Sequence, residues 1–147
     1  MASRISTRLR RTVENRADCV CEYCLIHADD AYVGFQVDHV ISEKHQGATV
    51  SENLALACSY CNRQKGSDVG SIDRTTRRFM RLFNPRTDLW SDHFKLVGVR
   101  IAWRTPMGEA TVRLLKQNDP LRIEERKALK QNGKYPTPAA LKRIRKS

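Results

Sequence analysis

Hydrophobic residues recur every four positions near the start of the chain. Ile5, Leu9 and Val13 share one helical face, which predicts a helix over residues 4–16. Later, the Thr-Pro pair at 105–106 and the Asp-Pro pair at 119–120 each combine a helix-capping residue with a first-turn proline. They predict helices that run to about residue 118 and to about residue 132. A similar Thr-Pro pair at 137–138 favours a final helix, with a segment that orders only on nucleic acid as the alternative.

Alternating apolar positions predict strands in two other stretches. Val33, Phe35 and Val37 alternate with small or polar residues, which is the period of a half-buried strand, and this strand leads directly into an Asp-His pair at 38–39. Residues 94–103 favour a short hairpin that turns near Gly98. The polar, glycine-containing segment 42–53 is predicted to be a loop.

A second amphipathic pattern occupies residues 71–83. Ile72, Phe79 and Leu82 fall on one helical face, and the Asn-Pro pair at 84–85 is a natural end for a helix, so the pattern predicts a helix here. Another face of that helix carries four arginines, namely Arg74, Arg77, Arg78 and Arg81. A solvated surface is the ordinary meaning of such a stripe, but it has no balancing acids, which favours contact with DNA.

Composition and charge narrow the classes of partner. The chain has 147 residues, a length that predicts a single domain, and its formal net charge is +11 with an isoelectric point near 9.9. Such a charge favours polyanions, because cationic side chains neutralise phosphates and release counterions. No apolar run is long enough to span a membrane and no signal-peptide core is present, so we expect no membrane partner and a cytoplasmic location in a bacterial or phage-infected cell.

Four cysteines form two pairs with metal-binding spacing. Cys21 and Cys24 make one pair, Cys58 and Cys61 make the other, and the two pairs are separated by a long insert. Four thiolates suit a closed, tetrahedral and therefore structural zinc site. A redox role needs one pair only and leaves the other unexplained. Cys19 is left over, either as a free thiol or as a ligand in place of Cys21.

The segment that contains these cysteines resembles the HNH endonucleases. The matching residues are Cys21-Glu-Tyr-Cys24, then Val37-Asp38-His39-Val40-Ile41, then Asn53-Leu54 and finally Cys58-Ser-Tyr-Cys61-Asn62-Arg63-Gln64-Lys65-Gly66. The resemblance covers about a third of the chain. It implies an α+β fold with a ββα-metal core and a four-cysteine zinc site over residues 17–70. We expect residues 71–133 to elaborate this core with helices and a hairpin, and residues 134–147 to form a basic tail.

The resemblance also implies roles for four residues. His39 is the expected general base, and its ordinary pKa near 6.5 suits proton removal from water at neutral pH. Asp38 and Asn62 are the expected oxygen ligands of a catalytic Mg²⁺ or Mn²⁺, the hard ions that such ligands favour. Asn53 is expected to brace the loop and orient His39. The third motif position is asparagine in this chain and not histidine.

The function expected from these features is metal-dependent hydrolysis of DNA phosphodiester bonds, leaving 5′-phosphate and 3′-hydroxyl ends as the family does. Arg63 and Lys65 follow Asn62 on its helix and are candidate phosphate contacts, with a solvated helix face as the alternative. Two other functions stay open. One is a nuclease subunit that acts only inside a larger restriction, phage, mobile-element or defence complex, and the other is an inactive zinc-stabilised nucleic-acid-binding module. Whether the chain forms a homodimer also stays open.

Overall fold

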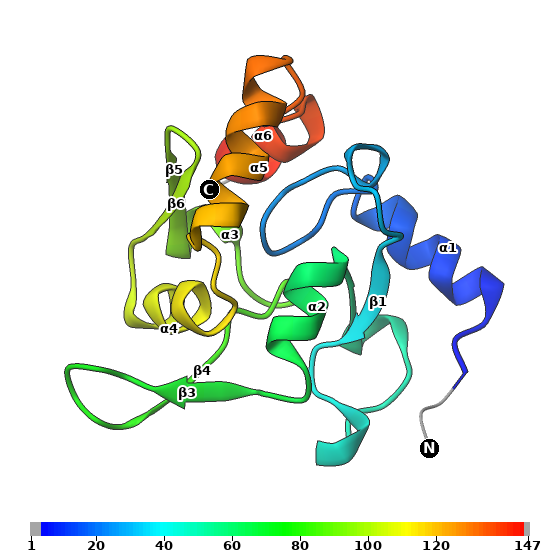
Figure 1. Ribbon diagram of the computed structural model, residues 1–147. Helices are drawn as coiled ribbons and strands as arrows, with labels where there is room; N and C mark the ends of the chain where they lie inside the picture. Colours follow the sequence, from blue (N-terminus) through cyan, green and yellow to red (C-terminus); the bar gives the residue numbers. More distant parts are fainter. Residues whose placement is uncertain (1–3, 146–147) are drawn as a thin grey trace.

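Two antiparallel strands and a short helix lie at the centre of the molecule (Figure 1). The computed structural model describes residues 4–145. Strand β1 (Gln36–His39) pairs with β2 (Leu54–Ala57), so that Asp38 lies opposite Ala55 and His39 opposite Leu54. Strand β2 is buried along its whole length, and α2 (Ser59–Lys65) follows it directly. This confirms the predicted α+β class, with two strands between the cysteine pairs and a helix that begins within the second pair.

The remaining helices surround this centre. Their bounds are α1 (Thr7–Arg16), α3 (Trp90–His93), α4 (Pro106–Leu114), α5 (Pro120–Gln131) and α6 (Pro138–Arg145), with 3₁₀ turns η1 (Ala28–Asp30), η2 (Glu43–His45) and η3 (Ser51–Asn53). Four of the five helices were predicted from apolar spacing or from proline pairs. Ser6 and Thr105 cap α1 and α4, because each side-chain oxygen accepts a hydrogen bond from a backbone N–H of the first turn.

The predicted helix over residues 71–83 is wrong. This segment is a second hairpin, made by β3 (Gly70–Ile72) and β4 (Phe79–Arg81). Ile72 and Phe79 are cross-strand partners. Two side chains seven residues apart lie on one face of a helix, but in a hairpin of this length they also lie opposite each other, so the spacing fits both structures. The hairpin predicted at residues 94–103 is confirmed as β5 (Phe94–Val97) and β6 (Arg100–Trp103).

One hydrophobic cluster joins the N-terminal and C-terminal parts of the chain. Val13 of α1, Leu56 of β2, Ile101 of β6 and Leu115 after α4 are all fully or almost fully buried in it. Trp90 and Phe94 are also buried, whereas Trp103 is 49% exposed. No helix of the described residues is long and apolar enough to cross a membrane.

The predicted basic tail packs against the body as far as it is described. Tyr135 is buried and its hydroxyl donates to the carbonyl of Cys24 at 2.8 Å, so the segment is tied to the first cysteine pair. Helix α6 follows, with Ala140 buried and Arg143 donating to the carbonyl of Arg16 at 3.1 Å. Residues 146–147, which the predicted tail includes, lie outside the described residues. The described part is therefore a packed helix and not a free arm.

Candidate functional site

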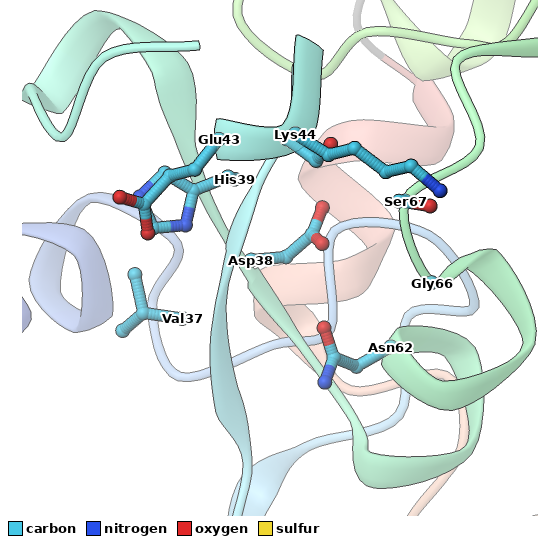
Figure 2. Close-up of a pocket in the computed structure, with 9 residues that line it drawn as sticks. Val37, Asp38, His39, Glu43, Lys44, Asn62, Gly66 and Ser67 are labelled. Atoms are coloured by element: carbon cyan, nitrogen blue, oxygen red, sulfur yellow. The ribbon is translucent and has the colours of Figure 1, made fainter. Parts of the chain in front are cut away.

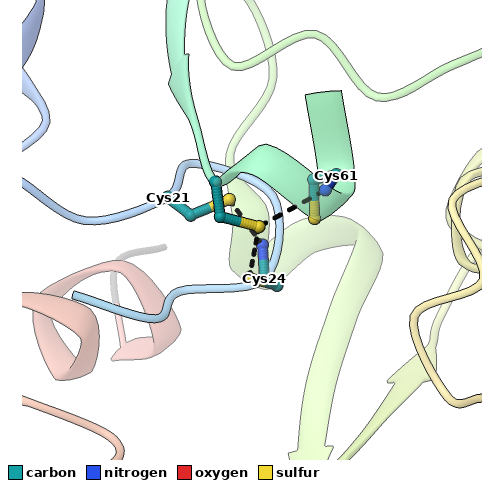
Figure 3. Close-up of side chains that lie close together, drawn as sticks. Cys21, Cys24 and Cys61 are labelled. Atoms are coloured by element: carbon teal, nitrogen blue, oxygen red, sulfur yellow. Dashed lines mark hydrogen bonds between the residues drawn. The ribbon is translucent and has the colours of Figure 1, made fainter. Parts of the chain in front are cut away.

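The four predicted zinc ligands meet in one buried cluster. The sulfur atoms of Cys21, Cys24, Cys58 and Cys61 all lie within 4.8 Å of one another, and all four residues are buried. Figure 3 shows Cys21, Cys24 and Cys61 converging on a common point. The Cys24 and Cys58 sulfurs are 3.7 Å apart. Four Zn–S bonds of about 2.3 Å at tetrahedral angles place two sulfurs about 3.8 Å apart, so the cluster fits a thiolate-binding metal such as zinc.

Local backbone structure prepares this cluster. The amide of Cys24 points at the sulfur of Cys21 at 3.4 Å, and the amide of Cys61 points at the sulfur of Cys58 at 3.3 Å. Cys58 is also the N-cap residue of α2, so the second pair is fixed where the helix begins. Burial raises the pKa of the Cys21 thiol well above its ordinary value, a shift that a bound cation would oppose.

Cys19, the alternative ligand, and His27, the histidine that follows the first cysteine pair, do not join the cluster. Cys19 is a partly exposed free thiol and is not in the four-cysteine group. His27 caps η1, since its Nδ1 accepts a hydrogen bond from the Asp29 amide at 3.0 Å. The described residues therefore place the two Cys-x-x-Cys pairs, and neither alternative, around the metal position.

An arginine from the C-terminal half lies against the cluster. Arg122 of α5 is almost fully buried, and its Nη2 lies 3.0 Å from the sulfur of Cys24 and 3.5 Å from that of Cys58. Its guanidinium also stacks over the Tyr60 ring, 4.5 Å from the ring centroid. Burial alone would lower the pKa of Arg122, but the nearby cysteine thiolates raise it above its ordinary value. The sequence pattern gave no sign of this contact, because 98 residues separate Arg122 from Cys24.

Asp38, His39 and Asn62 line one pocket at the end of β1. Its other walls come from η2 and from the residues that follow α2, including Glu43, Lys44 and Ser67. Figure 2 shows the Asp38 carboxylate and the Asn62 carboxamide on one side of β1, with the amide oxygen directed toward Asp38. His39 lies on the other side of the strand beside Glu43. Neighbouring residues of a strand point to opposite sides, so Asp38 and His39 lie on opposite sides of β1. Both still line the same pocket, because β1 ends at His39.

Lys65 holds the carboxylate of Asp38. Its Nζ lies 3.3 Å from Oδ1 and 3.1 Å from Oδ2, and the Tyr23 hydroxyl donates to Oδ2 at 3.0 Å. Burial raises the pKa of Asp38, and Lys65 opposes that shift. Lys65 is only 1% exposed, so its predicted contact with DNA phosphates is wrong. Asn62 and Lys65 are three residues apart on one helix face, a spacing that directs both toward Asp38.

His39 is held through one ring nitrogen. Its Nε2 lies 2.9 Å from Oγ1 of Thr49 and 3.7 Å from a carboxylate oxygen of Glu43. These two side chains come from the loop between β1 and β2 and from η2. Neither was among the predicted site residues, because the polar loop shows no periodic pattern that orients its side chains.

Asn53 braces the loop that carries these residues. Its Oδ1 accepts from the Ile41 amide, and its Nδ2 donates to the carbonyls of Ile41 and Ala48, each at 2.9 Å. Gly47 lies under this brace, since a Cβ atom there would be 1.7 Å from the Ile41 carbonyl oxygen. The geometry matches the bracing expected of Asn53, and it explains the glycine in the loop.

Comparison with known families accounts for this arrangement. Residues 21–68 match the sequence profile of the HNH endonuclease family. These residues, about a third of the chain, are similar to an HNH domain. The matched range contains both cysteine pairs and the pocket residues Asp38, His39, Asn53 and Asn62. The domain indicates a nuclease in general. Searches of curated proteins and of solved structures find no match to the chain.

The five arginines predicted to bind DNA phosphates differ in their surroundings. Arg63 is exposed on α2. Arg74, Arg77 and Arg78 are exposed between β3 and β4, on a hairpin loop and not on a helix face. Arg81 forms a bidentate ion pair with Asp88, at 2.8 and 3.0 Å, and is thereby committed to an internal contact. Arg74 lies 4.0 Å from a carboxylate oxygen of Glu109, but 72% of its side chain is exposed, so it stays a candidate for phosphate binding together with Arg63, Arg77 and Arg78.

Proposed function

We propose that this protein is a metal-dependent endonuclease that hydrolyses phosphodiester bonds in DNA. The observation that carries the proposal is the meeting of Asp38, His39 and Asn62 at one pocket within the HNH domain. Hydrolysis of a phosphodiester needs a group that accepts a proton from water and a cation that stabilises charge on the phosphate. A histidine and two oxygen ligands supply those requirements. The net charge of +11 supports a polyanionic substrate.

His39 is the proposed general base. Thr49 Oγ1 and the Glu43 carboxylate both lie near Nε2, and two oxygen acceptors favour the tautomer that carries its proton on that nitrogen. Nδ1 then has a free lone pair and accepts the proton of the attacking water. Glu43 also stabilises the imidazolium that results, because its carboxylate lies 3.7 Å from the ring. Thr49 and Glu43 are positioning residues in this proposal.

Asp38 and Asn62 are the proposed holders of the catalytic cation. Their donors are a carboxylate oxygen and an amide oxygen, the chemistry that Mg²⁺ and Mn²⁺ prefer, and both residues line the same pocket. When bound there, such an ion supplies a Lewis acid for the phosphate oxygens. Lys65 opposes the rise in the pKa of Asp38 that burial causes, and it fixes the direction of the carboxylate.

The proposed reaction is an in-line displacement at phosphorus. The water molecule gives one proton to His39 Nδ1 while its oxygen forms a bond to phosphorus. The bond between phosphorus and the 3′ oxygen breaks, and that oxygen takes up a proton from solvent. The products are a 5′-phosphate and a 3′-hydroxyl. One base and one cation site act on one strand at each encounter.

Substitutions at Asn62 test the cation site. We expect Asn62→Ala to raise the Mg²⁺ concentration required for half-maximal cleavage by at least about tenfold, or about 1.4 kcal/mol of binding free energy, because an oxygen ligand is lost. Asn62→Asp keeps an oxygen at the same place and should retain cleavage. The measurement is a Mg²⁺ titration of the cleavage rate of a labelled duplex. Equal Mg²⁺ dependence in Asn62→Ala and the parent protein would remove Asn62 from the site.

Zinc is the proposed occupant of the cysteine cluster, and Arg122 is its proposed counter-charge. Four thiolates around Zn²⁺ carry a net charge of −2 in a buried place, and the guanidinium of Arg122 lies 3.0 Å from one of them. We expect Arg122→Gln to weaken zinc binding by about 10–100-fold, the usual effect of losing a partner that supports metal ligands. The measurement is zinc transfer to a coloured chelator. Lys127→Gln, an exposed substitution on the same helix, should leave zinc transfer unchanged.

A further inference from the structure

The β3–β4 hairpin has a structured tip rather than a loose loop. The Asp73 carboxylate accepts hydrogen bonds from the amide and the hydroxyl of Thr76, at 2.8 and 2.7 Å. Arg77 adopts a left-handed backbone conformation with φ of 62°, and its amide donates to the Asp73 carbonyl at 2.9 Å. The carboxylate of Asp73 is therefore bound within the turn, and the turn fixes the backbone positions of the arginines at its tip.

The hairpin is also fixed to the body of the protein. Arg113 of α4 donates to the Ile72 carbonyl at 2.9 Å, and its Nη1 lies 3.4 Å from the Ser71 hydroxyl. Met80, the cross-strand partner of Ser71, packs against the hydrophobic core. One face of the hairpin thus lies against the body, which orients the opposite face outward.

The outward face combines apolar and cationic side chains. Ile72 and Phe79 form a cross-strand pair on it and are 45% and 61% exposed. Gly70 leaves room for the Phe79 ring, since a Cβ atom there would lie 2.3 Å from it. In the loop that joins the two strands, Arg74, Arg77 and Arg78 are all exposed. Asp73 is the one acid in this loop. Arg74 also lies 4.0 Å from a carboxylate oxygen of Glu109 on α4, but its side chain is 72% exposed. The face therefore carries more cations than acids.

The hairpin begins next to the proposed active site. Gly66 and Ser67 line the same pocket as Asp38 and His39, and β3 starts three residues after Ser67. Figure 1 shows the hairpin extending from the lower edge of the molecule, the edge that also holds the turn after β1. A duplex that reaches the pocket along this edge passes the hairpin.

We propose that the β3–β4 hairpin is a DNA-binding arm that enters the major groove of the duplex beside the bond that is cut. This inference rests on the proposed nuclease function. The major groove of B-DNA admits a two-stranded β-ribbon. In that position Arg74, Arg77 and Arg78 bind phosphates that flank the groove, and the Ile72–Phe79 pair faces base edges and thymine methyl groups. The positive charge favours DNA as the occupant over an apolar protein surface or a second copy of the chain.

The test compares two variants with the same loss of charge. In the hairpin variant Arg74, Arg77 and Arg78 are replaced by glutamine. In the control variant the exposed Lys127, Lys130 and Lys134 are replaced instead, at the end of the molecule that lies opposite the hairpin in Figure 1. Binding to a duplex is measured by fluorescence anisotropy over a salt series, with Ca²⁺ in place of Mg²⁺.

We expect the hairpin variant to bind at least about tenfold more weakly at 0.15 M salt. Its log–log salt slope should fall by about 2.7, at about 0.9 for each of three lost phosphate contacts. The control should stay close to the parent protein. Equal weakening of both variants would show a mere net-charge effect, and unchanged binding by the hairpin variant would show that DNA lies elsewhere. Either result contradicts a DNA-binding role of the hairpin. A hairpin variant that loses self-association but keeps its DNA binding would contradict that role as well.

A small substrate separates this inference from the proposed function. Bis(p-nitrophenyl) phosphate is a phosphodiester too small to reach the hairpin, so its hydrolysis should be the same in the hairpin variant and the parent. A parent protein that hydrolyses neither this diester nor DNA contradicts the proposed function, whatever the hairpin does in binding. A parent that hydrolyses both, with DNA binding indifferent to the hairpin, contradicts the arm alone.

Discussion

Replacement of His39 by alanine is expected to slow DNA cleavage by about 10²–10⁴-fold, the usual contribution of a general base. The substitution removes the hydrogen bond to Thr49 and the contact with Glu43, and it keeps the backbone pairing of β1 and the cysteine cluster. The variant should therefore keep its metal and its thermal unfolding temperature close to the parent's. The measurement is the single-turnover rate of cleavage of a labelled duplex at saturating Mg²⁺.

His45→Ala is the matched control for this substitution. His45 lies in η2, is exposed, and is not among the residues that line the pocket, so its loss should leave the rate unchanged. Added imidazole should restore part of the activity of His39→Ala, since a small base can replace the lost side chain in the space that it leaves. An undiminished rate in His39→Ala would remove the proposed base from the mechanism.

Replacement of Cys58 by serine is expected to release the metal and unfold the HNH domain. Structural zinc contributes about 10–16 kcal/mol of apparent binding free energy. That amount is comparable with the entire stability of a typical domain, about 5–15 kcal/mol. Cys58 also caps α2, and serine is a favoured N-cap residue, so the substitution removes a thiolate while it keeps a capping oxygen. The loss of stability can then be assigned to the metal.

Metal content and denaturant unfolding measure this effect together. Cys19→Ser supplies the control, because it changes the fifth cysteine, which lies outside the cluster. The control should keep about one zinc per chain and unfold at the parent's denaturant concentration. A Cys58→Ser protein that stays folded without zinc would show that the cluster does not support the domain.

Helices were predicted correctly where the capping residues and the spacing of hydrophobic residues fit a helix alone. The proline pairs at 105–106 and 119–120 gave α4 and α5, and the four-residue spacing of Ile5, Leu9 and Val13 gave α1. The prediction for residues 71–83 failed because the spacing of the apolar residues fits both a helix and a hairpin. Asp73 and Thr76 are the signal that decides between them, since an aspartate that binds an amide three residues later makes a turn.

Motif residues of the site were predictable, and their supporting contacts were not. Asp38, His39 and Asn62 were expected from the resemblance, and the structure brings all three to one pocket. The burial of Lys65 follows from a requirement that the sequence does not display, namely that a buried carboxylate needs a cation. Its spacing from Asn62 was a usable sign of this contact. Arg122 had no such sign, because tertiary packing alone brings α5 to the cysteines.

The single most direct measurement of the proposed function is the fate of supercoiled plasmid incubated with the purified protein. With Mg²⁺ we expect nicked circles to appear before linear DNA, with 5′-phosphate and 3′-hydroxyl ends at the breaks. EDTA at a dose that leaves zinc bound should stop the reaction, and added Mg²⁺ or Mn²⁺ should restore it. His39→Ala under the same conditions should leave the plasmid supercoiled. Plasmid that stays intact with the parent protein and Mg²⁺, or that is cut equally by His39→Ala, would contradict the proposal.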